Sequence, residues 1–170
     1  MIRAGILTVS DKGFRGERED KSGEVIRKIL EGIGAEVLRY AVVPDEIPDI
    51  RESLREWADR DGLDLILTTG GTGFWQRDVT PEATVQVLER RAPGISEAIR
   101  AEGRKKTPHA ILSRGAAGIR GRTLIVNLPG SPRGAGESLE IVLPALLHGI
   151  GILRGDAREC GSEAGRGGGH

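Results

Sequence analysis

Residues 64–83 read DLILTTGGTGFWQRDVTPEA, and this stretch decides the fold because a strand, a glycine-rich loop and a helix start follow one another directly. The compact apolar run over 64–69 is typical of a buried strand. The glycines after it can continue neither a strand nor a helix. Thr80 then stands as a capping residue before the helix-initiating Pro81, which predicts a helix running from Thr80 toward Glu89.

The residues before this stretch alternate between strand and helix patterns. Residues 2–9 are apolar and run into a polar loop, which predicts a buried strand. Helical spacing predicts a helix over 23–31 with Ser22 as its N-cap. A strand over 37–43 and a helix over 48–60 follow. The side chains that this second helix should turn inward are Ile50, Leu54, Trp57 and Ala58.

The residues after the glycine-rich stretch add two helices and a hairpin. A helix is predicted over 95–105, and a long, largely buried helix over 138–153. Between them, residues 116–120 and 123–127 flank a short turn, which predicts two antiparallel strands.

The order of these elements predicts an α/β fold. Right-handed crossovers return each strand to the same sheet, which gives a three-layer, open, mostly parallel sheet with helices on both faces and one antiparallel hairpin strand. A chain of 170 residues with one unbroken succession of elements predicts a single domain over residues 1–158. Residues 159–170 should be a flexible tail, because they carry too few apolar side chains to offset the entropy of ordering.

Composition narrows the classes of partner. The 25 basic and 25 acidic residues balance, which argues against a general nucleic-acid or membrane-surface binder. Cys160 is the single cysteine, so no internal disulfide can form, and a reducing cytoplasm fits best. With no apolar run of membrane-spanning length and no cleavable leader pattern, we expect a soluble protein that is not exported.

Four unusual loops should meet beyond the carboxyl ends of the strands, where open α/β sheets bind their ligands. They are Ser10-Asp11, Pro44-Asp45, Gly70 to Asp78 and Asn127 to Ser131. Gly70, Gly71 and Gly73 would let backbone amides turn toward an anion, and phosphate is the natural guest. A plain tight turn accounts for the glycines about as well.

Asp45 and Asp78 lie just past two different strands and could face the same phosphates. Two carboxylates beside an anion repel it unless a cation lies between them, and Mg²⁺ takes one or two carboxylates together with phosphate oxygens. We therefore predict that Asp45 and Asp78 hold Mg²⁺. The alternatives are an ordinary turn residue for Asp45 and a helix-terminus role for Asp78.

Residues 127–131 end a strand and open a helix, so they offer amide hydrogens and a hydroxyl to a second anion. Ser131 has the alternative role of capping the last helix, and Ser10-Asp11 that of an Asx-type turn. Arg77 and Arg114 are candidates to neutralise phosphates.

Several motifs together resemble the molybdopterin adenylyltransferases of the MogA/MoaB type, and the resemblance covers nearly the whole chain. The motifs are Thr8-Val9-Ser10-Asp11, Asp20-Lys21-Ser22-Gly23, Pro44-Asp45-Glu46, Thr68 to Phe74, Arg77 to Thr84, Leu112-Ser113-Arg114, and Asn127-Leu128-Pro129-Gly130-Ser131-Pro132.

The resemblance implies a homotrimeric enzyme that binds molybdopterin and Mg-ATP, transfers AMP to the terminal phosphate of the pterin and releases pyrophosphate. A partner protein would then insert molybdenum. It also implies site residues: Asp45 and Asp78 for adenylyl transfer, and Ser10, Asp11, Gly70, Gly71, Thr72, Gly73, Ser113, Asn127, Pro129, Gly130 and Ser131 for binding the substrates.

Two other functions stay open at this point. One is a non-catalytic molybdopterin-binding or scaffolding module, against which the presence of both Asp45 and Asp78 argues. The other is a nucleotide-dependent hydrolase, which is less favoured because the sequence shows no Ser/His/Asp set. The motifs are common to the MogA and MoaB branches and fit molybdenum or tungsten equally.

Overall fold

The apolar runs of the chain form the centre of a six-stranded sheet with the order β2-β1-β3-β6-β5-β4. In this computed structural model residues 1–156 are described, so Cys160 and the predicted tail over 159–170 lie outside the described residues. The central strands are β1 (Arg3–Val9), β3 (Leu65–Thr69) and β6 (Thr123–Leu128). All three are parallel, and β2 (Glu36–Val43) extends the parallel part beside β1.

The antiparallel part of the sheet begins at the predicted hairpin. Strand β5 (Ala117–Arg120) pairs antiparallel with β6, and the two-residue strand β4 (Arg90–Arg91) pairs with β5 on its other side. The hairpin is confirmed, as is the mostly parallel α/β fold. The sequence analysis did not predict β4.

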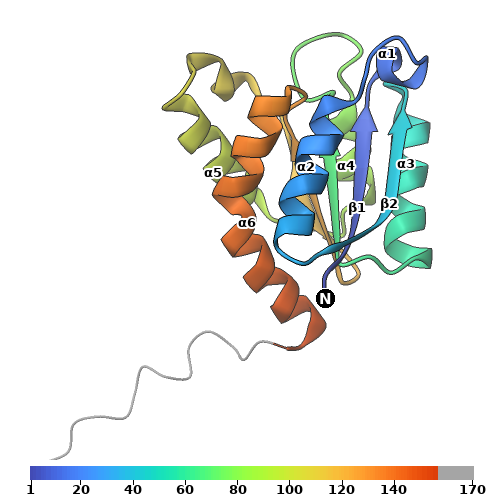
Figure 1. Cartoon of the computed structure of the whole chain (residues 1–170), viewed down its shortest axis with the longest axis vertical. Coiled ribbons are helices and arrows are strands. Elements are labelled where there is room, and N and C mark those ends of the chain that lie inside the picture. Colours follow the sequence, from blue (N-terminus) through green and yellow to red (C-terminus); the bar gives the residue numbers. More distant parts are fainter. Residues whose placement is uncertain (157–170) are drawn as a thin grey trace, which may run out of the picture.

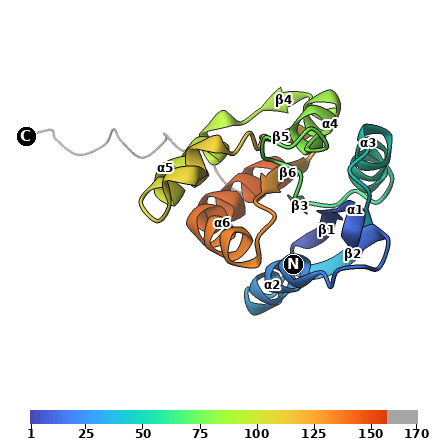
Figure 2. The ribbon, with the colours of Figure 1, turned by 90° about the horizontal axis from the view of Figure 1, so that it is seen from above.

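Helices cover both faces of the sheet (Figures 1 and 2). On one face α2 (Lys21–Gly32), α5 (Pro93–Arg104) and α6 (Pro132–Arg154) pack through residues such as Ile26, Ile99 and Leu139. On the other face lie α3 (Ile47–Arg55), the π-helical turn η1 (Glu56–Arg60) and α4 (Thr80–Val87). Ile50, Leu54 and Trp57 are buried there, as predicted.

Two predicted N-caps and one predicted helix start were wrong, while the predicted start of α4 at Thr80 is confirmed. Asp20, not Ser22, caps α2, and its carboxylate accepts a hydrogen bond from the Gly23 amide. Val79 is the N-cap residue of α4, so Thr80 is the first helical residue. The Thr80 hydroxyl does not cap the helix and binds the Gly70 carbonyl. Helix α6 begins at Pro132, six residues before the predicted Ser138, because Ser131 caps it.

Two short helices also lie where loops were predicted or left unassigned. They are α1 (Asp11–Phe14), directly after β1, and the 3₁₀ helix η2 (Pro108–Leu112).

Helix α6 is long and apolar enough to cross a membrane by length and composition alone. In the fold, Leu139, Leu146 and Ile150 are buried in the cluster that α6 forms with the sheet. Only 33% of the most apolar 18-residue stretch of α6 is buried, so the prediction of a largely buried helix was too strong. It is a core helix with one buried face.

Candidate active site

A cavity of about 750 Å³ opens beyond the carboxyl ends of β1 and β3. Each of the four predicted loops contributes some of its residues to the lining. The predicted site residues that line it are Ser10, Asp45, Gly70, Gly71, Asp78, Gly130 and Ser131. The meeting of strand-end loops at one edge of the sheet is therefore what the structure shows.

The glycine loop needs glycine for two separate reasons. Gly70 and Gly71 have φ values of 96° and 68°, a region that L side chains rarely adopt. A Cβ on Gly70 would lie 2.3 Å from the Val9 carbonyl oxygen, and one on Gly71 would lie 2.3 Å from Thr80 Oγ1. Thr80 Oγ1 donates to the Gly70 carbonyl at 2.9 Å, which ties the loop to the start of α4. Glycine is therefore required at both positions, and the hydrogen bond from Thr80 links the loop to α4.

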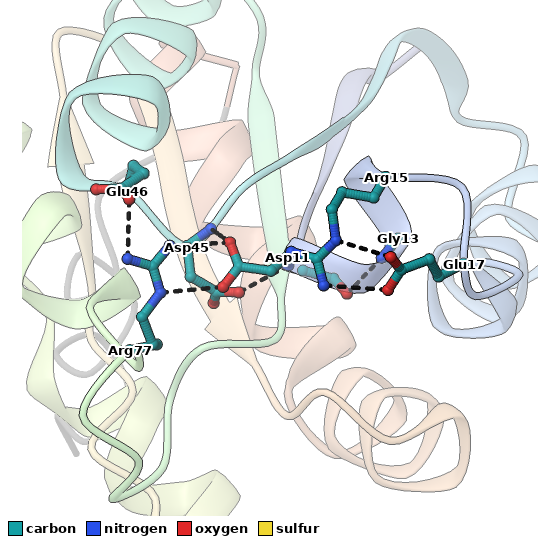
Figure 3. Close-up of polar contacts among 8 residues, drawn as sticks. Asp11, Gly13, Arg15, Glu17, Asp45, Glu46 and Arg77 are labelled. Atoms are coloured by element: carbon teal, nitrogen blue, oxygen red, sulfur yellow. Dashed lines mark hydrogen bonds and ion pairs between the residues drawn. The ribbon is translucent and has the colours of Figure 1, made fainter.

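Asp11 and Asp45 bind each other's backbone. The Asp11 amide donates to Asp45 Oδ2 at 2.8 Å, and the Asp45 amide donates to Asp11 Oδ1 at 3.0 Å. Arg77 donates to both carboxylate oxygens of Asp11 at 3.0 Å and to Glu46 Oε1 at 2.8 Å (Figure 3). Asp11 is not among the cavity-lining residues, so in this structure it positions Asp45.

The carboxylates differ in their electrostatic surroundings. Burial raises the pKa of Asp45 above its ordinary value, and the nearby charges of Asp11 and Asp78 act in the same direction. The hydrogen bonds from Arg77 lower the pKa of Asp11. Asp45 and Asp78 are therefore close enough to repel each other, and a cation between them would relieve that repulsion.

Replacing Asp45 with Asn should raise the stability of the metal-free protein at neutral pH. Because the pKa of Asp45 is raised in the folded state, its charged form opposes folding above that pKa. The increase in Tm should shrink as the pH falls toward the ordinary value of 3.8. Thermal unfolding of both proteins with a chelator, over a pH series, measures it.

The control for this experiment is Asp59→Asn. The pKa of Asp59 is lowered by its hydrogen bonds from Arg120, so its loss should change Tm in the opposite direction. A lower Tm for Asp45→Asn at neutral pH would contradict the assignment of unfavourable burial to Asp45.

Asp78 is held by its own loop. Its Oδ2 accepts from the Trp75 amide at 3.0 Å, and its carbonyl accepts from Arg114 Nη2 at 2.8 Å. Arg114 also donates to the Gly73 carbonyl and pairs with Glu82. Arg77 and Arg114, predicted to neutralise phosphates, thus both bind groups of the protein itself.

The remaining predicted residues separate into two groups. Thr72, Gly73, Ser113 and Pro129 line a neighbouring, mostly apolar pocket of about 300 Å³ that shares Ser131 with the cavity. Ser131 Oγ accepts from the Gly134 amide at 3.0 Å, so it does cap α6 as the alternative reading proposed.

Asn127 lines neither hollow. Its side chain is 3% exposed; Nδ2 donates to Thr68 Oγ1 and Thr84 Oγ1 at 2.9 Å, and Oδ1 accepts from the Ala116 amide at 3.0 Å. This side chain joins β3, α4 and the start of β5 to β6. Its contacts in the structure are therefore those of a structural residue.

Asn127→Ala should lower the free energy of unfolding by about 1–3 kcal/mol, because it leaves buried polar groups without their partner. Denaturant unfolding measures this loss, with Ser53→Ala as the control, since Ser53 makes an exposed bond to the Asp49 carbonyl. Equal losses for the two variants would show that the buried network is unimportant.

The sequence analysis missed one wall of the cavity. Asp20 accepts from Thr8 Oγ1 at 2.7 Å and from the Tyr40 hydroxyl, and Ser22 Oγ donates to the Gly130 carbonyl at 2.6 Å. Arg18 and Lys21 add cations to the same wall. The signal was available, because the Asp20-Lys21-Ser22-Gly23 motif carries part of the family resemblance, but spacing alone does not place it here.

The donor set of the cavity fits Mg²⁺ better than a metal that needs many protein ligands. Among residues 1–156 there is no group of three or more His, Cys, Asp or Glu side chains arranged to hold a metal. Four carboxylates line the cavity, those of Glu19, Asp20, Asp45 and Asp78. Asp20 is already bound by Thr8 and Tyr40. Mg²⁺ is commonly bound by one or two carboxylates plus substrate phosphates, so Asp45 and Asp78 suffice to hold it.

This chain is similar to known proteins in both sequence and fold. Residues 5–148 match the family described as a probable molybdopterin binding domain. A molybdopterin adenylyltransferase from Helicobacter pylori strain J99 is 42% identical over 91% of this chain and 89% of its own length. The Drosophila molybdenum cofactor synthesis protein cinnamon is 44% identical, but the match spans only 26% of that longer protein.

A solved structure agrees with these matches. The molybdopterin biosynthesis enzyme MoaB from Thermus thermophilus superposes with a TM-score of 0.87 and 61% identity, over 91% of this chain and 98% of that one. The chain belongs to the MogA/MoaB family of molybdopterin-binding domains.

Proposed function

We propose that this chain is a molybdopterin adenylyltransferase: it transfers AMP from ATP to the terminal phosphate of molybdopterin and releases pyrophosphate. The observation that carries the proposal is the pair Asp45 and Asp78, which line one cavity together with the glycine loop. The curated name of the Helicobacter relative supports it.

The proposed reaction asks little of the protein as an acid or base. A phosphate oxygen of molybdopterin attacks the α-phosphorus of ATP, the bond to the β-phosphate oxygen breaks, and pyrophosphate leaves. The attacking group is already an anion, so the protein must bring two anions together and mask their repulsion. Mg²⁺, held by Asp45 and Asp78, would supply positive charge at the transferred phosphate.

The roles of the other site residues are assigned from their place in the cavity or in the neighbouring apolar pocket. We assign Gly70, Gly71, Ser10 and Gly130 to the phosphates, since they line the polar cavity. We assign the neighbouring pocket, with Thr72, Gly73, Ser113 and Pro129, to the flat pterin. Ser131 lines both and lies where the two substrates would meet. Asp11 acts through Asp45, and Asn127 through the end of β6.

The test is an incubation with molybdopterin, Mg²⁺ and ATP labelled at the α-phosphate. Labelled pterin and an equal amount of pyrophosphate are expected, and both should be lost in Asp45→Ala and Asp78→Ala. Tight molybdopterin binding without AMP transfer would support the non-catalytic module instead.

The wider setting is also part of the proposal. We expect a cytoplasmic homotrimer, formed by one domain over residues 1–158, that passes adenylylated molybdopterin to a molybdenum-inserting partner protein. The exposed side chains of Phe74 and Trp75, 70% and 84% accessible beside the cavity, offer an apolar surface for such contacts. Analytical ultracentrifugation of the wild type measures the oligomeric state.

A further inference from the structure

The guanidinium of Arg77 joins the loops that follow three neighbouring strands of the sheet. Arg77 itself lies in the loop after β3, immediately before Asp78. Its Nε and Nη2 each donate to one carboxylate oxygen of Asp11, which follows β1, at 3.0 Å. Its Nη1 donates to Glu46 Oε1, in the loop after β2, at 2.8 Å. One side chain therefore ties together the ends of β2, β1 and β3 (Figure 3).

Each point that Arg77 reaches is directly attached to a carboxylate of the cavity. Asp11 exchanges hydrogen bonds with Asp45, because the Asp11 amide donates to Asp45 Oδ2 at 2.8 Å and the Asp45 amide donates to Asp11 Oδ1 at 3.0 Å. Glu46 is the next residue after Asp45 in the chain, as Asp78 is the next after Arg77. Arg77 thus connects the two segments that carry Asp45 and Asp78.

The other side of the Asp78 loop is fixed by Arg114. This arginine donates to the Gly73 carbonyl at 2.9 Å and to the Asp78 carbonyl at 2.8 Å, and it pairs with Glu82 of α4. Arg114 therefore holds the loop against α4, whereas Arg77 links the same loop to the segments after β1 and β2. The position of Asp78 relative to α4 and its position relative to Asp45 are set by different arginines.

The form of the contact suits orientation better than stabilisation. The Arg77 side chain is 54% exposed, and ion pairs at such positions contribute little to the free energy of unfolding. A guanidinium that binds both oxygens of one carboxylate, however, fixes the direction as well as the length of the contact. Its third bond, to Glu46, fixes the plane of the group at a second point.

We infer that Arg77 is a positioning residue that sets the separation of the Asp45 and Asp78 carboxylates, so that one divalent cation can bind both. It acts through its bonds to Asp11 and Glu46. Mg²⁺ demands near-ideal octahedral geometry, so a shift of one carboxylate weakens its binding. The inference rests on the proposed function in one respect, the cation that the pair would hold.

The test is the binding of Mn²⁺ alone to the full chain, followed by the electron paramagnetic resonance signal of the free ion. Mn²⁺ prefers the same oxygen ligands as Mg²⁺. Arg77→Lys keeps the positive charge but replaces the planar fork with a point charge. It should raise the Kd for Mn²⁺ about tenfold, as expected when a group that orients a metal ligand is lost. If Arg77 supplied charge alone, lysine would replace it without loss.

Arg120→Lys is the matched control. Arg120 also binds both oxygens of one carboxylate, those of Asp59 at 2.9 and 2.8 Å, and makes a third bond to the Val87 carbonyl at 3.0 Å. This fork lies outside the residues that line the cavity. The control should leave the Kd for Mn²⁺ unchanged, and the Tm of both variants shows whether either has lost its fold.

A double variant tests the route of the effect. Asp11→Asn keeps one oxygen that can accept from the Asp45 amide but removes the second oxygen that the fork requires. With Asn at this position, Arg77→Lys should raise the Kd for Mn²⁺ by about threefold or less, because the shared link is already broken.

Three outcomes would overturn the inference: a Kd of Arg77→Lys equal to that of the wild type, an equal rise in Arg120→Lys, or full additivity with Asp11→Asn. Mn²⁺ binding that is absent from the wild type, or that survives Asp45→Ala and Asp78→Ala, would overturn it together with the metal assignment. A wild type that binds Mn²⁺ through this pair but transfers no AMP would remove the proposed function and leave the role of Arg77 intact.

Discussion

Asp78→Asn is expected to lower the rate of adenylyl transfer by about 10²-fold or more, because it removes several kcal/mol of metal-held charge stabilisation from the transition state. The fold should be unaffected. Asp78 Oδ2 accepts from the Trp75 amide, and an asparagine oxygen can accept the same bond. Molybdopterin binding should remain close to that of the wild type, because Asp78 does not line the pocket assigned to the pterin.

Single-turnover transfer from labelled ATP measures this effect, with molybdopterin binding and Tm recorded on the same preparation. Asp49→Asn on α3 is the matched control, since it removes one exposed carboxylate away from the cavity. If Asp78 acts by holding Mg²⁺, a higher Mg²⁺ concentration should recover part of the lost rate. A variant with near-normal turnover would exclude Asp78 from the mechanism.

Gly70→Ala should lower the free energy of unfolding by about 2–5 kcal/mol, the sum of left-handed strain and a forced backbone shift. At φ 96° the new methyl group would lie 2.3 Å from the Val9 carbonyl oxygen. Neither partner can rotate away, because Val9 ends β1 and the Gly70 carbonyl is bound by Thr80. Denaturant unfolding measures the loss.

Gly34→Ala separates the two causes. Gly34 has a φ of 78°, but a Cβ there would meet nothing within 4 Å, so this variant should lose only about 1–2 kcal/mol. Equal losses at the two positions would mean that the contact with Val9 contributes nothing.

Much of the fold could be predicted because hydrophobic period and turn residues record it directly. Strands β1, β3 and β6 are runs that burial keeps apolar, and the hairpin at β5 follows from a short turn. Helix starts were harder, because Asp20 and Ser22 are both good caps and tertiary contact decides between them. Ser22 is directed to the Gly130 carbonyl, which leaves the capping role to Asp20. Strand β4 is too short to have a period.

The candidate site was predictable where the argument rested on strand ends, as for Asp45 and Asp78, which line one cavity. The prediction failed where the side chain of a polar residue could face either the cavity or the core. Asn127 ends a strand, yet its side chain enters the core and bonds Thr68 and Thr84. Whether the side chain of a strand residue faces the ligand or the core depends on its neighbours in space, and these are far away in the sequence.

The hydrogen bond from Ser22 to Gly130 spans 108 positions of the chain. One wall of the cavity is therefore translated long before the other. While the ribosome is still adding β6, the earlier strands can pair, but the loops that follow β1 and β3 still lack the opposite wall of the cavity. The nascent chain also exposes the edge of β3 that β6 will cover. The substrates should consequently protect only the finished chain from proteolysis, and truncation before Ser131 should abolish that protection.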